Sequence, residues 1–118
     1  MNRLLNSFSN AINGIITYFK TGGNVIIHLV SGLIAILLAY LLDCTRIEWI
    51  IIILIIGIVL AAEALNTAIE YIVDIVSPEY NQKAGEIKDM AAGAVLLISI
   101  SAIVAGTIIF LPKMIHFF

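Results

Sequence analysis

Three long apolar segments separated by short polar ones dominate the chain. Residues 25–42, 47–62 and 90–111 are almost entirely apolar, and helical periodicity carries the second segment on to about residue 76. Each segment is close to the roughly 20 residues with which a helix crosses about 30 Å of hydrocarbon. Lipid offers the backbone no hydrogen-bond partners, so helices are favoured over strands. The pattern predicts three transmembrane helices, within 25–42, 47–76 and 90–111.

Residues 1–21 show a different pattern. Their apolar side chains recur along one face of a helix, at Leu4, Phe8, Ala11, Ile12, Ile15 and Phe19. Asparagines and serines interrupt them, so the segment is too polar to span a membrane and lacks the unbroken apolar core of a signal peptide. We expect an amphipathic surface helix, ended by Gly22-Gly23.

Proline and the charged residues set the remaining boundaries. Ser77-Pro78 is expected to end the second long helix, residues 79–89 to form a polar loop, and Pro112 to close the third helix. Four basic residues fall on one side of a three-span chain and two on the other: Arg3, Lys20, Lys83 and Lys88 against Arg46 and Lys113. The positive-inside rule then places the N-terminus and the 77–90 loop in the cytoplasm.

Composition supports a membrane protein and excludes several other classes. Of the 118 residues, 62% are hydrophobic and 12% are charged, whereas soluble domains have about 45–50% and about 25%. The length allows a single domain, 1–118. A net charge of −2 without a basic stripe argues against nucleic acid as a partner. A single cysteine, Cys44, excludes an intramolecular disulfide and a cysteine-cluster metal site.

The second long helix carries an unusual polar face. Glu63, Asn66, Glu70 and Asp74 are spaced i, i+3, i+7 and i+11, so they share one side of a helix. An acidic residue in a membrane helix costs on the order of 2.5–3.5 kcal/mol and marks a functional site by default. Carboxylates bind Mg²⁺ and accept protons, and phosphoryl transfer to a lipid hydroxyl needs both functions. A stripe that joins helices, or one that lines an ion path, would give the same pattern.

Lys88-Asp89 precedes the third apolar segment. A lysine there can neutralise phosphate charge, or it can serve only as a cytoplasmic anchor that sets topology.

Two motifs together resemble a known family. The motif E-x-x-N-T-A-I-E-x-x-V-D at residues 63–74 is followed by Ser77-Pro78-Glu79-Tyr80 and then by K-D-x-A-A-G-A-V at residues 88–95. This combination resembles the prokaryotic diacylglycerol kinase family, which includes the undecaprenol kinases. The resemblance implies an all-α integral membrane protein, a homotrimeric bundle of three-span subunits with surface helices, whose active sites are shared between neighbours.

The resemblance also implies an activity and its residues. The enzyme would transfer the γ-phosphate of ATP, with Mg²⁺, to diacylglycerol or undecaprenol in the bacterial cytoplasmic membrane. Glu63 would be the general base and Glu70 the metal ligand. Further positions match polar residues of the active site, nucleotide contacts or substrate contacts: Asn66 and Asp74; Arg3, Glu79, Tyr80, Asn81, Lys88 and Asp89; and Asn24 and His28.

The chain departs from the family at Gly22, where the second metal-binding glutamate of the family falls, and at Ile26, where a basic residue is common. Fewer carboxylates would weaken Mg²⁺ binding. The alternative to a kinase is therefore a catalytically impaired scaffold or lipid-binding relative, and Gly22→Glu is expected to raise activity or Mg²⁺ affinity. His28 could equally be a residue that packs helices together.

Overall fold

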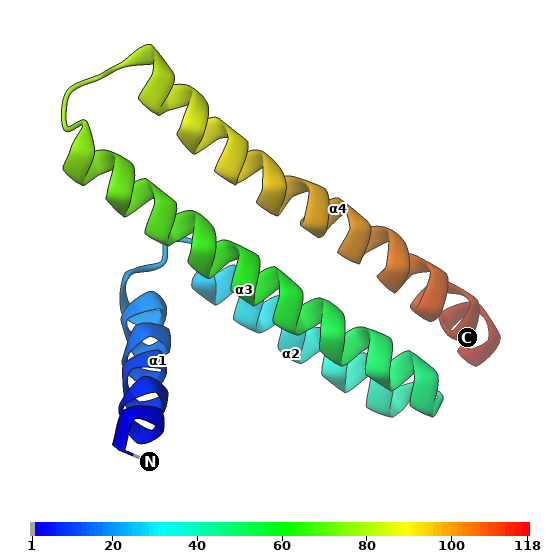
Figure 1. The fold of residues 1–118 in the computed structure, drawn as a ribbon. Helices are drawn as coiled ribbons and strands as arrows, with labels where there is room; N and C mark the ends of the chain where they lie inside the picture. Colours follow the sequence, from blue (N-terminus) through cyan, green and yellow to red (C-terminus); the bar gives the residue numbers. More distant parts are fainter. Residues whose placement is uncertain (1) are drawn as a thin grey trace.

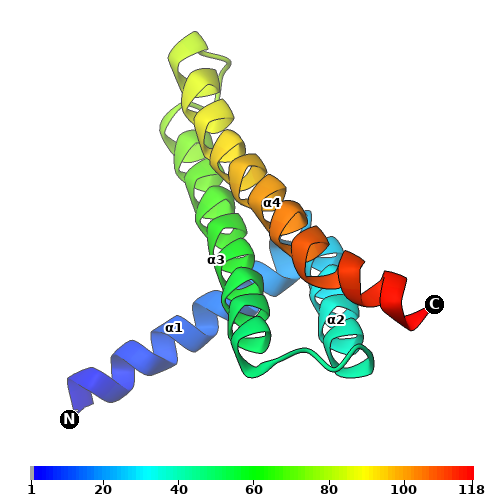
Figure 2. The same ribbon diagram turned by 90° about the vertical axis from the view of Figure 1, so that its right-hand side faces the viewer.

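The computed structural model describes residues 2–118 and is entirely helical in its regular elements. The chain order is α1 (Asn2–Thr21), α2 (Val25–Leu41), α3 (Arg46–Val76) and α4 (Gln82–Phe117). Helices α3 and α4 run antiparallel as one long hairpin, and α2 lies along the first half of α3 (Figure 1). Helix α1 turns away from α2 by 103° at the Gly22-Gly23 break (Figure 2). The prediction of an all-α protein is confirmed.

The lengths of the helices limit how the chain can cross a membrane. Helices α3 and α4, with 31 and 36 residues, are each long and apolar enough to span. Helix α2 has 17 residues, about 26 Å at 1.5 Å per residue, and passes the same test only when it is joined to α1. The described residues therefore offer two spans, or three if the bent pair forms one.

The packed core is small for a chain of this size. Ala39, Ile52 and Ile109 form a buried cluster that joins α2, α3 and α4, with Trp49 and Ile56 packed against it. Most other large apolar side chains of these helices are exposed. Exposed apolar surface on this scale is far beyond what a soluble monomer carries. These faces fit a lipid environment or contact with further copies of the chain.

Helix ends follow local sequence. Thr45 caps α3 in a capping box with Glu48. Asn81 caps α4, its side-chain oxygen accepting hydrogen bonds from the backbone N–H groups of Lys83 and Ala84.

Two predicted boundaries are wrong. The polar loop expected over 79–89 is only the short segment 77–81, because the Asn81 cap starts α4 at once and residues 82–89 continue as a polar helix. An ion pair between Lys83 and Glu86, 3.7 Å long, supports that first turn. Pro112 does not end α4, which continues to Phe117. Proline removes one backbone hydrogen bond, the one to the carbonyl of Ile108, and α4 continues on both sides of that loss.

Candidate active site

The position of the polar face along α3 follows from helix geometry. Measured from Arg46, Glu63 lies about 26 Å along the axis, Glu70 about 36 Å and Asp74 about 42 Å. The hydrocarbon layer is about 30 Å thick. If that layer begins near Arg46, Glu63 lies just inside its far boundary, whereas Glu70 and Asp74 project beyond it into water.

Glu63 is deeply buried for an ionisable residue, with 3% of its surface exposed. Its carboxylate Oε2 lies 3.6 Å from His28 Nε2, which comes from the first turns of α2. Thr67 donates a hydrogen bond of 3.0 Å to the backbone carbonyl of Glu63, one turn before it. The structure thus brings together Glu63 and His28, two residues that the sequence singled out separately. Asn24 is exposed, and its side chain does not cap α2.

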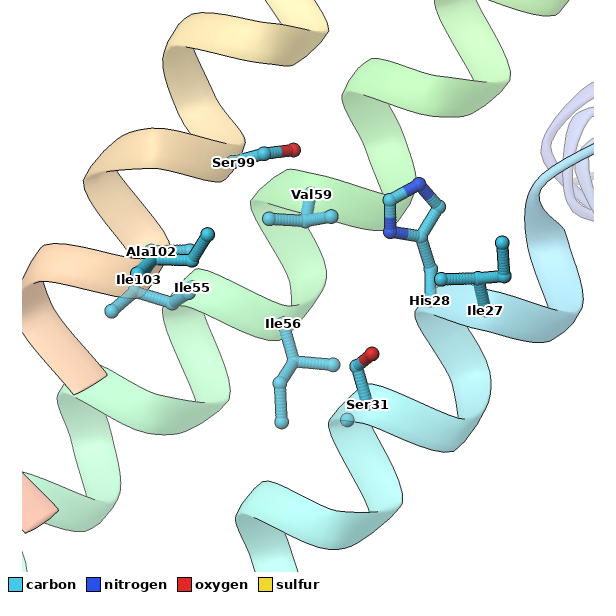
Figure 3. A pocket seen from close by; sticks show the side chains of 10 residues that line it. Ile27, His28, Ser31, Ile55, Ile56, Val59, Ser99, Ala102 and Ile103 are labelled. Carbon is cyan, nitrogen blue, oxygen red and sulfur yellow. The ribbon is translucent and has the colours of Figure 1, made fainter. Parts of the chain in front are cut away.

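His28 also faces a cavity of about 310 Å³ between α2, α3 and α4 (Figure 3). Its lining is apolar apart from His28, Ser31 and Ser99. One imidazole therefore lies beside both the buried carboxylate and a cavity suited to an apolar chain.

Asn66 and Glu70 form a pair one to two turns beyond Glu63. The Asn66 amide nitrogen donates a hydrogen bond of 3.2 Å to Glu70 Oε1. Its amide oxygen is buried and finds no hydrogen-bond partner within residues 2–118. Oxygen donors of this kind suit Mg²⁺, and a buried orphaned oxygen calls for a partner. The residues present therefore fit a magnesium ion, although the described chain does not by itself gather three His, Cys, Asp or Glu side chains around one point.

The connection between α3 and α4 gathers most of the predicted nucleotide residues. Lys88 of α4 forms an ion pair with Asp74 of α3. Both line a hollow of about 120 Å³, to which the 77–81 loop contributes Glu79, Tyr80 and Asn81. Asp89 is exposed outside this hollow.

Arg3 is not brought to this hollow. It lies near the start of α1, whose N-terminal end is remote from the α3–α4 connection in both views (Figures 1 and 2). Within one chain Arg3 does not line this hollow, and its nucleotide contact stays a prediction.

Tyr18 is a residue that sequence reasoning missed. It is the buried residue of α1, only 8% exposed, and its hydroxyl is buried with no hydrogen-bond partner in the described chain. Helix α1 lies outside the apolar helices α2–α4, and there burial raises the pKa of the Tyr18 phenol, with a further increase from the negative charge of Glu63. Tyr18 also lines a cavity together with Leu60, Ala61 and Ala64, which are neighbours of Glu63 on α3.

Gly22 is tied to Tyr18 by close contact. The Gly22 N–H donates a hydrogen bond of 2.7 Å to the Tyr18 carbonyl. A Cβ at position 22 would lie 2.6 Å from Tyr18 Cε1 and 2.8 Å from the Tyr18 carbonyl oxygen. The expectation that Gly22→Glu raises activity or Mg²⁺ affinity stays a prediction, and the tyrosine ring has to move before a side chain fits at position 22. Tyr18 lies three residues after Ile15 and seven after Ala11, so it continues the apolar face of α1, and that spacing was the available sequence signal.

Comparison with known proteins identifies the family. Residues 9–110 match the family described as prokaryotic diacylglycerol kinase. The chain is 37% identical over 114 residues to the undecaprenol kinase of Bacillus subtilis (strain 168), covering 97% of this chain and 93% of that protein. It is 39% identical over 112 residues to the diacylglycerol kinase of Synechocystis, covering 94% of this chain and 64% of that protein. It is 36% identical over 80 residues to the diacylglycerol kinase of Escherichia coli (strain K12), covering 68% and 66%. The chain therefore belongs to the prokaryotic diacylglycerol kinase family.

Proposed function

We propose that this protein transfers the γ-phosphate of ATP to the hydroxyl group of a membrane lipid. The observation that carries the proposal is the placement of Glu63: a buried carboxylate near the membrane boundary, with an apolar cavity reached through His28 on one side. On the other side of Glu63, toward water, lie Glu70 and Asp74 of α3 and Lys88 of α4, which pairs with Asp74. A lipid acceptor and a nucleotide donor could approach this carboxylate from opposite directions.

Each residue has a role in the proposed reaction. Glu63 accepts the proton of the lipid hydroxyl while that oxygen forms a bond to the γ-phosphorus. The bond between the γ-phosphorus and the bridging oxygen breaks, and ADP leaves. His28 faces the Glu63 carboxylate from the side of α2. Lys88 and the hollow formed with the 77–81 loop bind the nucleotide.

Glu70 and Asn66 would hold Mg²⁺, together with phosphate oxygens and water. When bound, the ion neutralises phosphate charge and aligns the γ-phosphate with the acceptor.

The acceptor we favour is undecaprenol. The relative from Bacillus subtilis, named an undecaprenol kinase, matches nearly end to end. The cavity beside His28 is lined chiefly by branched aliphatic side chains and could receive an isoprenoid chain. Diacylglycerol is the competing acceptor, because the relatives from Synechocystis and Escherichia coli are named diacylglycerol kinases.

We further propose a homotrimer with shared sites, inserted in the bacterial cytoplasmic membrane with α1 on its surface. The N-terminus and the 77–81 loop would lie in the cytoplasm, where ATP is found. The exposed apolar faces of α2–α4 support contact with other copies. The start of α1, which carries Arg3, is remote from the α3–α4 connection (Figures 1 and 2), and this supports a nucleotide contact made to a neighbouring subunit.

Radiolabelled ATP with Mg²⁺, incubated with purified protein in mixed micelles of either undecaprenol or diacylglycerol, tests the proposal. We expect label in the undecaprenol fraction. Transfer to diacylglycerol alone would overturn the choice of acceptor. Transfer to neither lipid by folded protein would favour the catalytically impaired alternative that Gly22 raises.

A further inference from the structure

The hydroxyl of Tyr18 is an unused hydrogen-bonding group in the interior. It is shielded from solvent and has no partner in the described part of the chain. Buried polar groups are almost always paired, because an unpaired one keeps the full cost of its desolvation. Phenylalanine would fill the same space without that cost. The hydroxyl therefore calls for a partner that the protein alone does not supply.

Tyr18 lies against the turns of α3 that carry Glu63. Its side chain lines a cavity of about 500 Å³ between α1 and α3, together with Leu60, Ala61 and Ala64 of α3. These three residues lie on the turns that carry Glu63, within three positions of it. Tyr18 thus brings a hydroxyl from α1 to the part of α3 that presents the proposed base.

Gly22 preserves this arrangement. Any side chain at position 22 would overlap the Tyr18 ring, because its Cβ would lie only 2.6 Å from Cε1. The neighbouring Gly23 has open space at the same point. The absence of a side chain at 22 and the buried ring at 18 are therefore two parts of one feature.

We propose that the Tyr18 hydroxyl donates a hydrogen bond to the oxygen of the acceptor lipid's hydroxyl group and so positions that group beside Glu63. This inference rests on the proposed lipid kinase function. An alcohol that gives its proton to Glu63 still has an oxygen lone pair that needs a donor, and a phenol supplies one. A tyrosine phenol is protonated at neutral pH and so able to donate, and burial moves the pKa of Tyr18 further above that range.

Tyr18→Phe tests this role by removing one oxygen atom and keeping the ring. Tyr40→Phe is the matched control, because Tyr40 is 73% exposed and lies near the far end of α2. Initial rates are measured over a range of lipid and of ATP concentrations, and thermal unfolding is followed by circular dichroism. We expect Tyr18→Phe to lower kcat/KM for the lipid about tenfold or more. The KM for ATP should equal that of the control variant. The unfolding midpoint should be equal to or higher than that of the control variant.

Three results would overturn the inference. Normal lipid kinetics in Tyr18→Phe would show that the hydroxyl does not meet the acceptor. A higher KM for ATP with normal lipid kinetics would assign the hydroxyl to the nucleotide. A lower unfolding midpoint would reveal a structural partner. Failure of the proposed function is distinguishable from all three, because there the wild-type protein itself transfers phosphate to neither lipid.

Discussion

The two ends of α3 differ in whether the polar side chains near them have hydrogen-bond partners within the chain. At the Arg46 end, Thr45 and Glu48 exchange both hydrogen bonds of a capping box, at 2.9 and 3.2 Å. Lys113 of α4 then closes on the Glu48 carboxylate at 2.9 Å. Each of these groups has a partner within the chain.

At the other end, partners are incomplete. Glu63 has His28 at 3.6 Å, which is longer than a hydrogen bond. The Asn66 amide oxygen and the Tyr18 hydroxyl, both buried, have no partner in residues 2–118. The comparison teaches that charge alone does not mark the site in this hairpin. The site is marked instead by buried polar groups that have no hydrogen-bond partner within the chain.

We expect the largest effect on phosphate transfer when the proton acceptor is removed. Glu63→Gln keeps the size of the side chain and removes its basicity, so we expect lipid phosphorylation to fall by about 10³-fold. Glu86→Gln, an exposed glutamate of α4, serves as the control. The rate of label transfer from ATP to lipid is the measurement. A Glu63→Gln variant as fast as the control would remove Glu63 from the chemistry.

Glu70→Gln tests whether Glu70 binds Mg²⁺ while Glu63 accepts the proton. Losing a metal carboxylate weakens Mg²⁺ binding, so we expect the Mg²⁺ concentration for half-maximal rate to rise about 10- to 100-fold. Titration of the initial rate with Mg²⁺ measures it. An unchanged Mg²⁺ requirement would mean that the metal is held elsewhere.

Gly22→Ala probes the contact that buries Tyr18, with Gly23→Ala as its matched control. The added methyl group collides with the tyrosine ring at position 22 but meets open space at position 23. We expect Gly22→Ala to lower the free energy of unfolding by about 1–3 kcal/mol relative to Gly23→Ala. Equal stability in detergent-based unfolding experiments would show that Tyr18 moves aside without cost.

Lys88→Met should have the smallest effect of the four substitutions. Its ammonium pairs with Asp74 at the rim of the nucleotide hollow, where both side chains are partly exposed. We expect the KM for ATP to rise about tenfold, with little loss of stability, because solvent screens exposed ion pairs. Lys83→Met, at a more exposed lysine of the same helix, is the control. Equal KM values for the two variants would exclude Lys88 from ATP binding.

Much of the fold could be predicted because hydrophobic length and helix breaks are local properties. The limits of α2 and α3 fall within one residue of those predicted, and Gly22-Gly23 separates α1 from α2 as expected. The early start of α4 does not follow from the same pattern, because residues 82–89 form a polar helix without an apolar stripe. The prediction for Pro112 is wrong, because the loss of a single backbone hydrogen bond does not stop α4.

Helical periodicity predicted the site only where its residues share one helix. The spacing of Glu63, Asn66 and Glu70 is enough to predict that they share one face of α3. The approach of His28 to Glu63 joins two helices, and the burial of Tyr18 depends on how α1 packs against α3. Such contacts depend on tertiary packing, which periodicity does not specify.

The most direct test of the account compares Glu63→Gln with Glu48→Gln, one from each end of α3. Initial transfer rate and thermal unfolding midpoint are measured for both variants in the same micelles. The account predicts a crossed result: Glu63→Gln loses transfer and keeps its unfolding midpoint, whereas Glu48→Gln keeps transfer and unfolds at a lower temperature. The account would be contradicted if Glu48→Gln lost phosphate transfer at an unchanged unfolding midpoint. It would also be contradicted if Glu63→Gln lowered the unfolding midpoint and left transfer unchanged.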